Sequence, residues 1–236
     1  MVRSLGMIVF SLLGVLAAEG AEEMGRFETT VKKQVGAHYL VSHPDDYDDR
    51  QEYPLLIFLH GRGEQGDDLE KVKIHGPMDT IRKLGLPLIV VAPQSPKDEP
   101  WDIDMLEAFV EHLFDELPVD RDRVYLTGLS LGGHGTWRLA VRRPDLFAAI
   151  VPICGYSQPS RAERLRDMGV WVFHGARDST ILLRESTAMV DALYAVGNDA
   201  RLTIYPKAGH NSWTETYKNP ALYEWLLSHN KRDRSR

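Results

Sequence analysis

The sequence predicts an α/β protein with a mostly parallel central sheet and helices on both faces. Apolar runs as long as buried strands alternate along the chain with stretches of helical spacing. Several runs, such as residues 54–59, are apolar throughout, as expected for strands covered on both faces. Segments rich in glycine and histidine follow these runs directly, where parallel sheets bind their ligands.

The expected elements follow in chain order. Residues 27–41 alternate in part, with Gly36 between two short runs, which predicts an N-terminal antiparallel hairpin. Buried strands are expected at residues 54–59, 86–92, 123–127, 148–153, 170–173 and 201–205. Helices are expected at residues 102–117, 131–143, 181–196 and 220–228. Only residues 155–169 separate two of the strands, which predicts that no large cap domain is inserted there.

The length of 236 residues suits one domain, which we expect at residues 27–229, followed by a disordered charged tail at 230–236. The net charge of −6 argues against nucleic acid as a partner. Cys154 is the one cysteine, so no internal disulfide forms. No H-E-x-x-H, cysteine pair or EF-hand spacing occurs, so we expect no metal and no cofactor. The oligomeric state stays open.

The N-terminus has the pattern of a secretory signal peptide at residues 1–20. Arg3 precedes an apolar run from Leu5 to Ala18, and small residues stand near a cleavage point after Gly20. The run is short for a membrane span, so we expect none after cleavage. The expected location is therefore secreted or periplasmic. The alternatives are an uncleaved anchor and a cytosolic N-terminal helix.

The segment Gly128-Leu129-Ser130-Leu131-Gly132 has the strand–turn–helix context of a serine nucleophile. A nucleophilic serine needs a base, and the base needs an orienting acid. Asp178 and His210 each lie on a loop just after a predicted strand. The order Ser130, Asp178, His210 and their strand-end positions predict a catalytic triad at one edge of the sheet.

An oxyanion needs backbone donors beside the nucleophile. We expect them to be the N–H groups of Leu131 and of Arg62, in the glycine-rich segment after the strand at 54–59. Residues 61–66 also match the dinucleotide fingerprint G-x-G-x-x-G, but the next strand ends in Ala-Pro-Gln without the required acid. Candidate residues of a substrate pocket are Trp101, Tyr156, Ile181 and Trp213. The histidines expected to pack or hydrogen-bond structurally are His60, His134 and His174.

The elbow segment 128–137 resembles the nucleophile elbow of the α/β-hydrolase superfamily. Within it the chain is similar to the small carboxylesterase, phospholipase/carboxylesterase and dienelactone-hydrolase-like group, including feruloyl-esterase-like proteins. Four further stretches carry the resemblance, which spans about residues 53–227: 60–64, 92–94, 174–178 and 209–213. The chain departs from relatives at Gln65, where Arg is frequent, and at Ile181-Leu182, where Val-Pro is frequent. The resemblance implies the α/β-hydrolase fold and the triad, but it does not specify the substrate.

The sequence as a whole predicts a serine carboxylic-ester hydrolase acting through an acyl-enzyme on a small-molecule or polymer-linked ester, with short-chain or aryl esters as the expected class. One alternative is a peptidase or a polysaccharide-deacylating or feruloyl esterase with the same triad. The other is a non-catalytic binding protein on a hydrolase scaffold.

Overall fold

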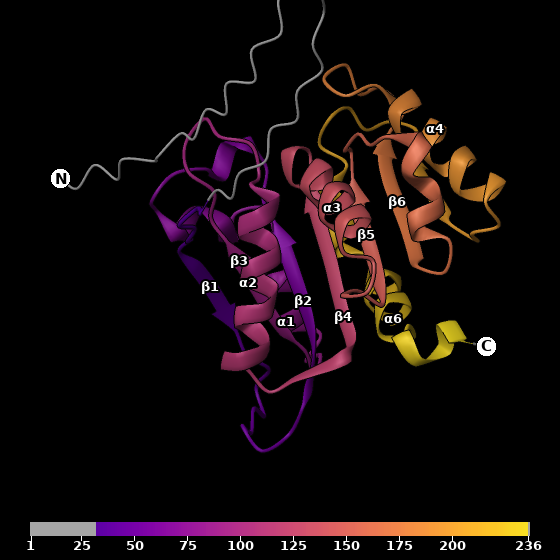
Figure 1. Ribbon diagram of the computed structural model, residues 1–236. Coiled ribbons are helices and arrows are strands. Elements are labelled where there is room, and N and C mark those ends of the chain that lie inside the picture. The colour runs from indigo at the N-terminus through magenta and orange to yellow at the C-terminus, as the bar shows by residue number, and fades with distance from the viewer. Residues whose placement is uncertain (1–31, 236) are drawn as a thin grey trace, which may run out of the picture. The chain divides into compact units, whose positions relative to one another are not determined.

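A computed structural model describes residues 32–235 of the chain (Figure 1). The chain divides into two units, residues 1–34 and 35–236, and the strands and helices belong to the second. The signal peptide expected at residues 1–20 lies outside the described residues and stays a prediction. No helix in the described part has the length and apolar character that crossing a membrane requires.

The described strands form one seven-stranded sheet in the order β1-β3-β2-β4-β5-β6-β7. All neighbours pair in parallel except β1, which runs antiparallel to β3. This arrangement confirms the predicted fold class. The strands are β1 (Tyr39–Ser42), β2 (Tyr53–Leu59), β3 (Ile89–Pro93), β4 (Val119–Leu129), β5 (Ala149–Ile153), β6 (Gly169–Gly175) and β7 (Arg201–Tyr205).

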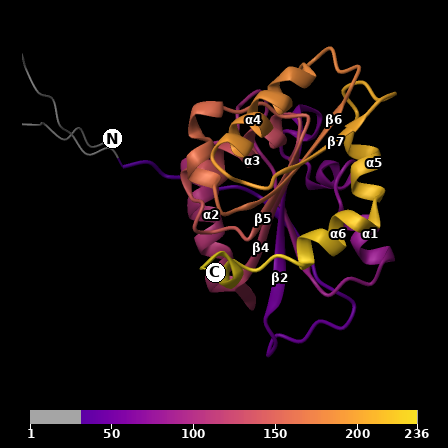
Figure 2. The same cartoon turned by 90° about the vertical axis from the view of Figure 1, so that its right-hand side faces the viewer.

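Helices cover both faces of the sheet, as Figure 2 shows. One face carries α2 (Ile103–Glu116), α3 (Leu131–Arg142) and α4 (Leu183–Ala195). The other carries α1 (Met78–Lys83), α5 (Trp213–Lys218) and α6 (Pro220–Leu227). Short 3-10 helices lie in the connections: η1 (Arg62–Glu64), η2 (Leu69–Lys73), η3 (Pro159–Leu165) and η4 (Lys231–Ser235). Only η3 occupies the interval between β5 and β6, so no large cap is inserted there.

Strand β2 shows why both faces need cover. Successive side chains of a strand point to opposite faces, so an unbroken apolar run feeds two cores. Leu55, Ile57 and Leu59 belong to the core on the side of α2, α3 and α4. Leu56 and Phe58 belong to the core on the side of α1, α5 and α6. All five side chains are completely buried, which makes β2 a rigid support for the loop that follows it.

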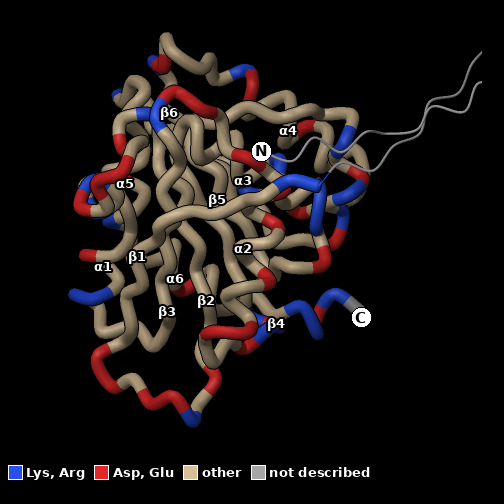
Figure 3. Tube along the Cα trace, turned by 60° about the vertical axis from the view of Figure 1, so that its left-hand side comes forward, with Lys and Arg blue, Asp and Glu red and all other residues tan. Residues whose placement is uncertain are grey.

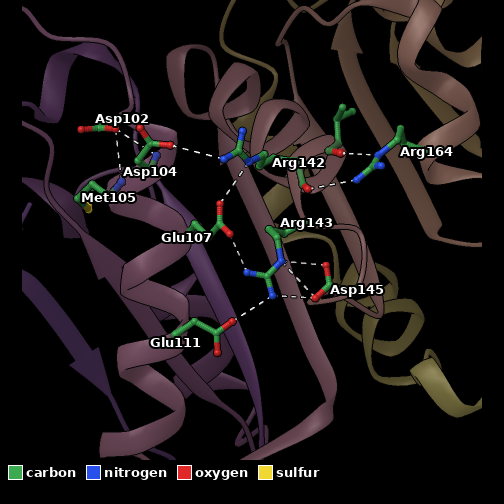
Figure 4. A network of polar contacts seen from close by, with 10 residues as sticks. Asp102, Asp104, Met105, Glu107, Glu111, Arg142, Arg143, Asp145 and Arg164 are labelled. Carbon is green, nitrogen blue, oxygen red and sulfur yellow. Dashed lines mark hydrogen bonds and ion pairs between the residues drawn. The ribbon is translucent and has the colours of Figure 1, made fainter. Parts of the chain in front are cut away.

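A cluster of ion pairs ties α3 to α2 at the end of α3 far from Ser130 (Figure 4). Arg143 donates to Glu107 and Glu111 of α2, at 2.9 and 3.0 Å, and to Asp145 beyond its own helix. Arg142 adds a second contact to Glu107 at 3.4 Å. The side chain of Arg143 is three-quarters buried, so this network holds the two helices in a fixed orientation.

Acidic residues concentrate in the connection from β1 to β2, whose segment is Asp45-Asp46-Tyr47-Asp48-Asp49. This connection is the largest red stretch at the bottom of Figure 3. Because it precedes β2, it lies at the amino end of the parallel strands. The charge of this loop is therefore at the edge of the sheet opposite to the predicted site.

The predicted hairpin is wrong in its pairing. Residues 27–31 lie outside the described part, and residues 32–38 form no strand. The strand that does form, β1, pairs with β3, with Tyr39 opposite Pro93 and Ser42 opposite Val90. The open edge of β3 supplies the hydrogen bonds that β1 needs, and the ring of Tyr39 packs against Phe109 of α2 at 5.0 Å.

Two further differences concern the C-terminal part. Strand β7 is predicted as buried but is the edge strand of the sheet, with Arg201 and Ile204 exposed. The expected disordered tail contains the 3-10 helix η4. Arg234 of η4 donates to the carbonyl oxygens of Pro144, Phe147 and Ala148, which attaches this segment to the start of β5.

Candidate active site

Ser130 sits on the sharp turn between β4 and α3. Its backbone has φ 52° and ψ −112°, a left-handed conformation that costs a residue with a side chain about 1–3 kcal/mol. The turn is held because the N–H of Ser130 donates to Ile153 O at 2.9 Å and its carbonyl accepts from His134 N at 3.0 Å. The strained turn projects the serine hydroxyl from the carboxyl edge of the sheet.

Ser130 and His210 lie within hydrogen-bond distance. The Oγ of Ser130 is 2.9 Å from Nε2 of His210, which lies on the loop after β7. The Nδ1 of the same imidazole is 2.7 Å from Oδ2 of Asp178, on the loop after β6. A carboxylate only accepts, so Nδ1 carries the ring proton and Nε2 is free to accept the serine proton. The structure thus brings together the three residues predicted for the triad.

Asp178 is fully buried at its side chain, and its carboxylate is saturated with donors. Oδ1 accepts from the backbone N–H groups of Thr180 and Ile181 at 2.8 and 3.0 Å, and Oδ2 accepts from His210. Burial alone raises the pKa of Asp178, but these hydrogen bonds outweigh it and hold the pKa below its usual value. The carboxylate is therefore ionised at neutral pH.

The loop after β2 lies directly against the serine turn. An added Cβ on Gly61 would meet the Leu129 side chain at 2.6 Å, so a larger residue there would require the Leu129 side chain to move. The N–H of Gly61 donates to the buried Glu64 carboxylate at 2.9 Å, which folds the loop back as η1. Among the described hydrogen bonds, none uses the N–H of Arg62 or of Leu131. Both predicted oxyanion donors thus have no hydrogen-bond partner within residues 32–235.

Hydrogen bonds of the buried His60 side chain also hold the loop after β2 in place. Its Nδ1 is 2.6 Å from Gly61 O, and its Nε2 accepts from Ser95 N at 3.1 Å. Trp101 packs on this ring at 4.8 Å between centroids and donates to the backbone oxygen of His60 at 3.2 Å. His60 thus has the structural role that the sequence predicts for it.

A family model described as "Dienelactone hydrolase family" matches residues 17–224. The chain belongs to this family. The likeness covers the strand-end loops that carry Ser130, Asp178 and His210, so the predicted superfamily and fold are confirmed.

Relatives of this dienelactone hydrolase family member include several esterases. The "Probable feruloyl esterase C" of Aspergillus niger is 24% identical over 77% of this chain and 70% of its own length. The NocK protein of Nocardia uniformis, which is named as an esterase, is 30% identical over 49% of this chain but only 36% of that protein. A solved structure of a thermostable esterase has a TM-score of 0.76 and 33% identity, over 81% of this chain and 59% of that one. These relatives support a hydrolase of the carboxylesterase type.

The four residues predicted for a substrate pocket of this family member have different environments. The prediction for Trp101 is wrong, because this side chain is only 1% exposed and packs beneath the loop after β2 instead of lining a pocket. Ile181 binds Asp178 through its backbone. Trp213 lies edge-on to the His210 ring, with 5.5 Å between the ring centroids. Tyr156 is 44% exposed and stacks on His134 at 3.7 Å, so its ring is held at the strand-end surface.

Metal ligands are limited to one cluster among the described residues. Cys154, Asp178 and His210 offer ligand atoms within 4.8 Å of one another. Asp178 and His210 already bind each other, and burial raises the pKa of the Cys154 thiol to about 12. A metal would have to displace both the hydrogen-bonded proton and a firmly held thiol proton. We therefore assign no metal to this cluster.

His60 should make this family member less stable in mild acid. Burial lowers its pKa to about 4, against an ordinary value near 6.5. Between these values the unfolded chain binds a proton that the folded chain excludes. Stability is therefore full above about pH 6.5 and falls by roughly 3 kcal/mol as the pH drops to 4. Urea unfolding of the wild type and of His60→Gln across this pH range measures the effect. If the free energy of unfolding fell equally steeply with decreasing pH in the two proteins, the prediction would be contradicted.

Proposed function

We propose that the protein is a serine carboxylic-ester hydrolase that works through an acyl-enzyme. The observation that carries the proposal is the continuous contact from Ser130 through His210 to Asp178, at 2.9 and 2.7 Å. The esterase relatives support the same chemistry. Short-chain and aryl esters are the expected substrates, and the predicted secretion fits a substrate outside the cytoplasm.

The reaction takes two acyl transfers. Ser130 Oγ attacks the acyl carbonyl while His210 Nε2 takes the hydroxyl proton, and Asp178 stabilises the imidazolium that forms. The N–H groups of Leu131 and Arg62 bind the oxyanion. The imidazolium then gives its proton to the departing alcohol. In the second half, His210 takes a proton from water, the hydroxide attacks the acyl-serine, and Ser130 recovers its proton as the acid leaves. Protonation of His210 blocks both halves, so the rate falls in acid.

A second candidate is the removal of acyl groups from a polysaccharide. The relatives named feruloyl esterase C and a bifunctional acetylxylan esterase/xylanase from Neocallimastix patriciarum favour it. The exposed aromatic surface of Tyr156 also suits a flat acyl group or a sugar face. The catalytic steps are unchanged, and only the recognised groups differ.

A fluorophosphonate probe tests the proposal directly. We expect one adduct, on the peptide that contains Ser130, and its formation should slow when an ester substrate competes. Rates on p-nitrophenyl acetate, methyl ferulate, acetylated xylan and a peptide p-nitroanilide then rank the substrate classes, with the amide slowest because its leaving group needs fuller protonation. An unlabelled protein that leaves every ester intact would instead support a binding protein on a hydrolase scaffold.

A further inference from the structure

A second histidine contacts the carboxylate of Asp178. His174 lies near the end of β6, four residues before Asp178, and its side chain is completely buried. Its Nε2 is 3.2 Å from Asp178 Oδ2, the same oxygen that accepts from His210. The proposed reaction as written above makes no use of this imidazole.

The protonation of His174 follows from its neighbours. Nε2 faces two oxygens that only accept, Ile181 O at 2.9 Å and Asp178 Oδ2 at 3.2 Å, so Nε2 must carry a proton. Nδ1 is 2.7 Å from Oγ of Ser186 in α4, and a hydroxyl can donate to it. The neutral ring with its proton on Nε2 satisfies every contact at once.

His174 and Asp178 hold the same residue from two sides. The carbonyl of Ile181 accepts from His174, while the N–H of Ile181 donates to Asp178 Oδ1 at 3.0 Å. The loop that presents Asp178 is therefore fastened to β6 through a buried side chain. Since Ser186 belongs to α4, the fastening extends to a helix that packs on the sheet.

We infer that His174 is a positioning residue of the active site, with Ser186 fixing its tautomer. This inference rests on the proposed function. The Nε2–H of His174 bonds to Ile181 O and lies 3.2 Å from the Asp178 Oδ2 that accepts from the Nδ1–H of His210. Its positive end therefore limits how strongly the carboxylate stabilises the imidazolium. His174 also keeps Asp178 Oδ2 directed at His210, because its hydrogen bond to Ile181 O holds the loop that carries Asp178.

Other ionisable groups near this pair act from different elements. Cys154, after β5, is a neutral thiol within 4.8 Å of both Asp178 and His210. His75 packs against Trp213 at 5.8 Å between ring centroids, and its Nε2 is 3.7 Å from the carboxylate of Glu64 in η1. Among the described ion-pair contacts, His174 is the second partner of Asp178 beside His210.

Two substitutions at position 174 separate positioning from folding. In His174→Leu the donor is lost, so Asp178 acts on His210 alone and from a loosened loop. The acidic limb of the kcat/KM profile should move to higher pH by roughly half a unit to one unit. The plateau should fall by about tenfold or more, because a displaced carboxylate misaligns the base. In His174→Gln a side-chain N–H takes the place of Nε2–H, and we expect the profile to return to that of the wild type with most of the plateau.

Controls make the result specific. Titration with the fluorophosphonate probe counts competent sites, so a loss of folded protein does not count as a loss of rate. Thr187→Ala, at a half-buried neighbour of Ser186 whose hydroxyl bonds only to Arg184 O within α4, should leave the profile unchanged, whereas Ser186→Ala should shift it in the direction of His174→Leu. A wild-type profile in titrated His174→Leu would overturn the inference. A fully active Ser130→Ala would instead overturn the proposed function.

Nitrogen-15 NMR of the wild-type histidines decides the point even if His174→Leu does not fold. We expect Nε2 of His174 to carry a proton. A ring whose Nε2 is unprotonated cannot donate to Ile181 O, and finding it would overturn the inference.

Discussion

Ser130→Ala should reduce kcat/KM on short-chain aryl esters by about 10⁴-fold or more while leaving the protein folded. Without Oγ, His210 has no proton to take and no acyl-enzyme forms. The remaining donors of the oxyanion loop can only assist attack by water. The measurement is initial-rate kinetics with p-nitrophenyl acetate, beside circular dichroism to verify folding.

A matched serine replacement gives the control for Ser130→Ala. Ser228 lies at the end of α6. The hydrogen bonds of its hydroxyl are local, to Trp225 O and His229 Nδ1, so Ser228→Ala should keep the wild-type rate. A Ser130→Ala enzyme within tenfold of the wild type would exclude the acyl-enzyme mechanism. Such a result would point to a water-attack mechanism or to another nucleophile.

Gly132→Ala should prevent stable folding. A Cβ at this position would lie 1.9 Å from Leu59 O and 2.6 Å from His60 O, both backbone atoms. Rotation of a side chain cannot relieve contacts with main chain, so either the first turn of α3 or the end of β2 would have to move. Both are packed in the core, and we expect a loss above roughly 4 kcal/mol, beyond the usual range for point substitutions. Soluble yield and thermal unfolding measure it.

Gly63, in η1, supplies the comparison. An added Cβ there meets nothing within 4 Å, and its φ is not in the left-handed region. Gly63→Ala should therefore fold with a melting temperature close to that of the wild type. If Gly132→Ala melted equally high, the close approach of α3 to β2 would be refuted.

The elements predicted best from sequence are those whose residues face two cores. The apolar run 54–59 falls within β2 and β5 falls within residues 148–153, because an unbroken apolar run has few other uses. The edges were harder to predict. Tyr39 and its neighbours pair with β3, a partner some 50 residues away, and no local pattern reports which edge is open.

The candidate triad could be predicted because strand ends gather at one edge whatever the details of packing. The surroundings could not. The buried Glu64 that binds the Gly61 N–H, and His174 behind Asp178, depend on how loops fold back over several residues. Trp101 shows the opposite failure: its place after a strand suggested a pocket, while its ring fills the space beneath His60.

The short η3 connection between β5 and β6 has a consequence for large substrates. Where a bulky insertion covers a hydrolase site, a polymer must enter end first or wait for the cover to open. Here the exposed ring of Tyr156 stands uncovered after β5, on the edge of the sheet where Ser130 is presented. If the proposed hydrolysis acts on a polymer, an acyl group in the middle of a long chain would reach this edge from the side, without a free chain end having to enter first.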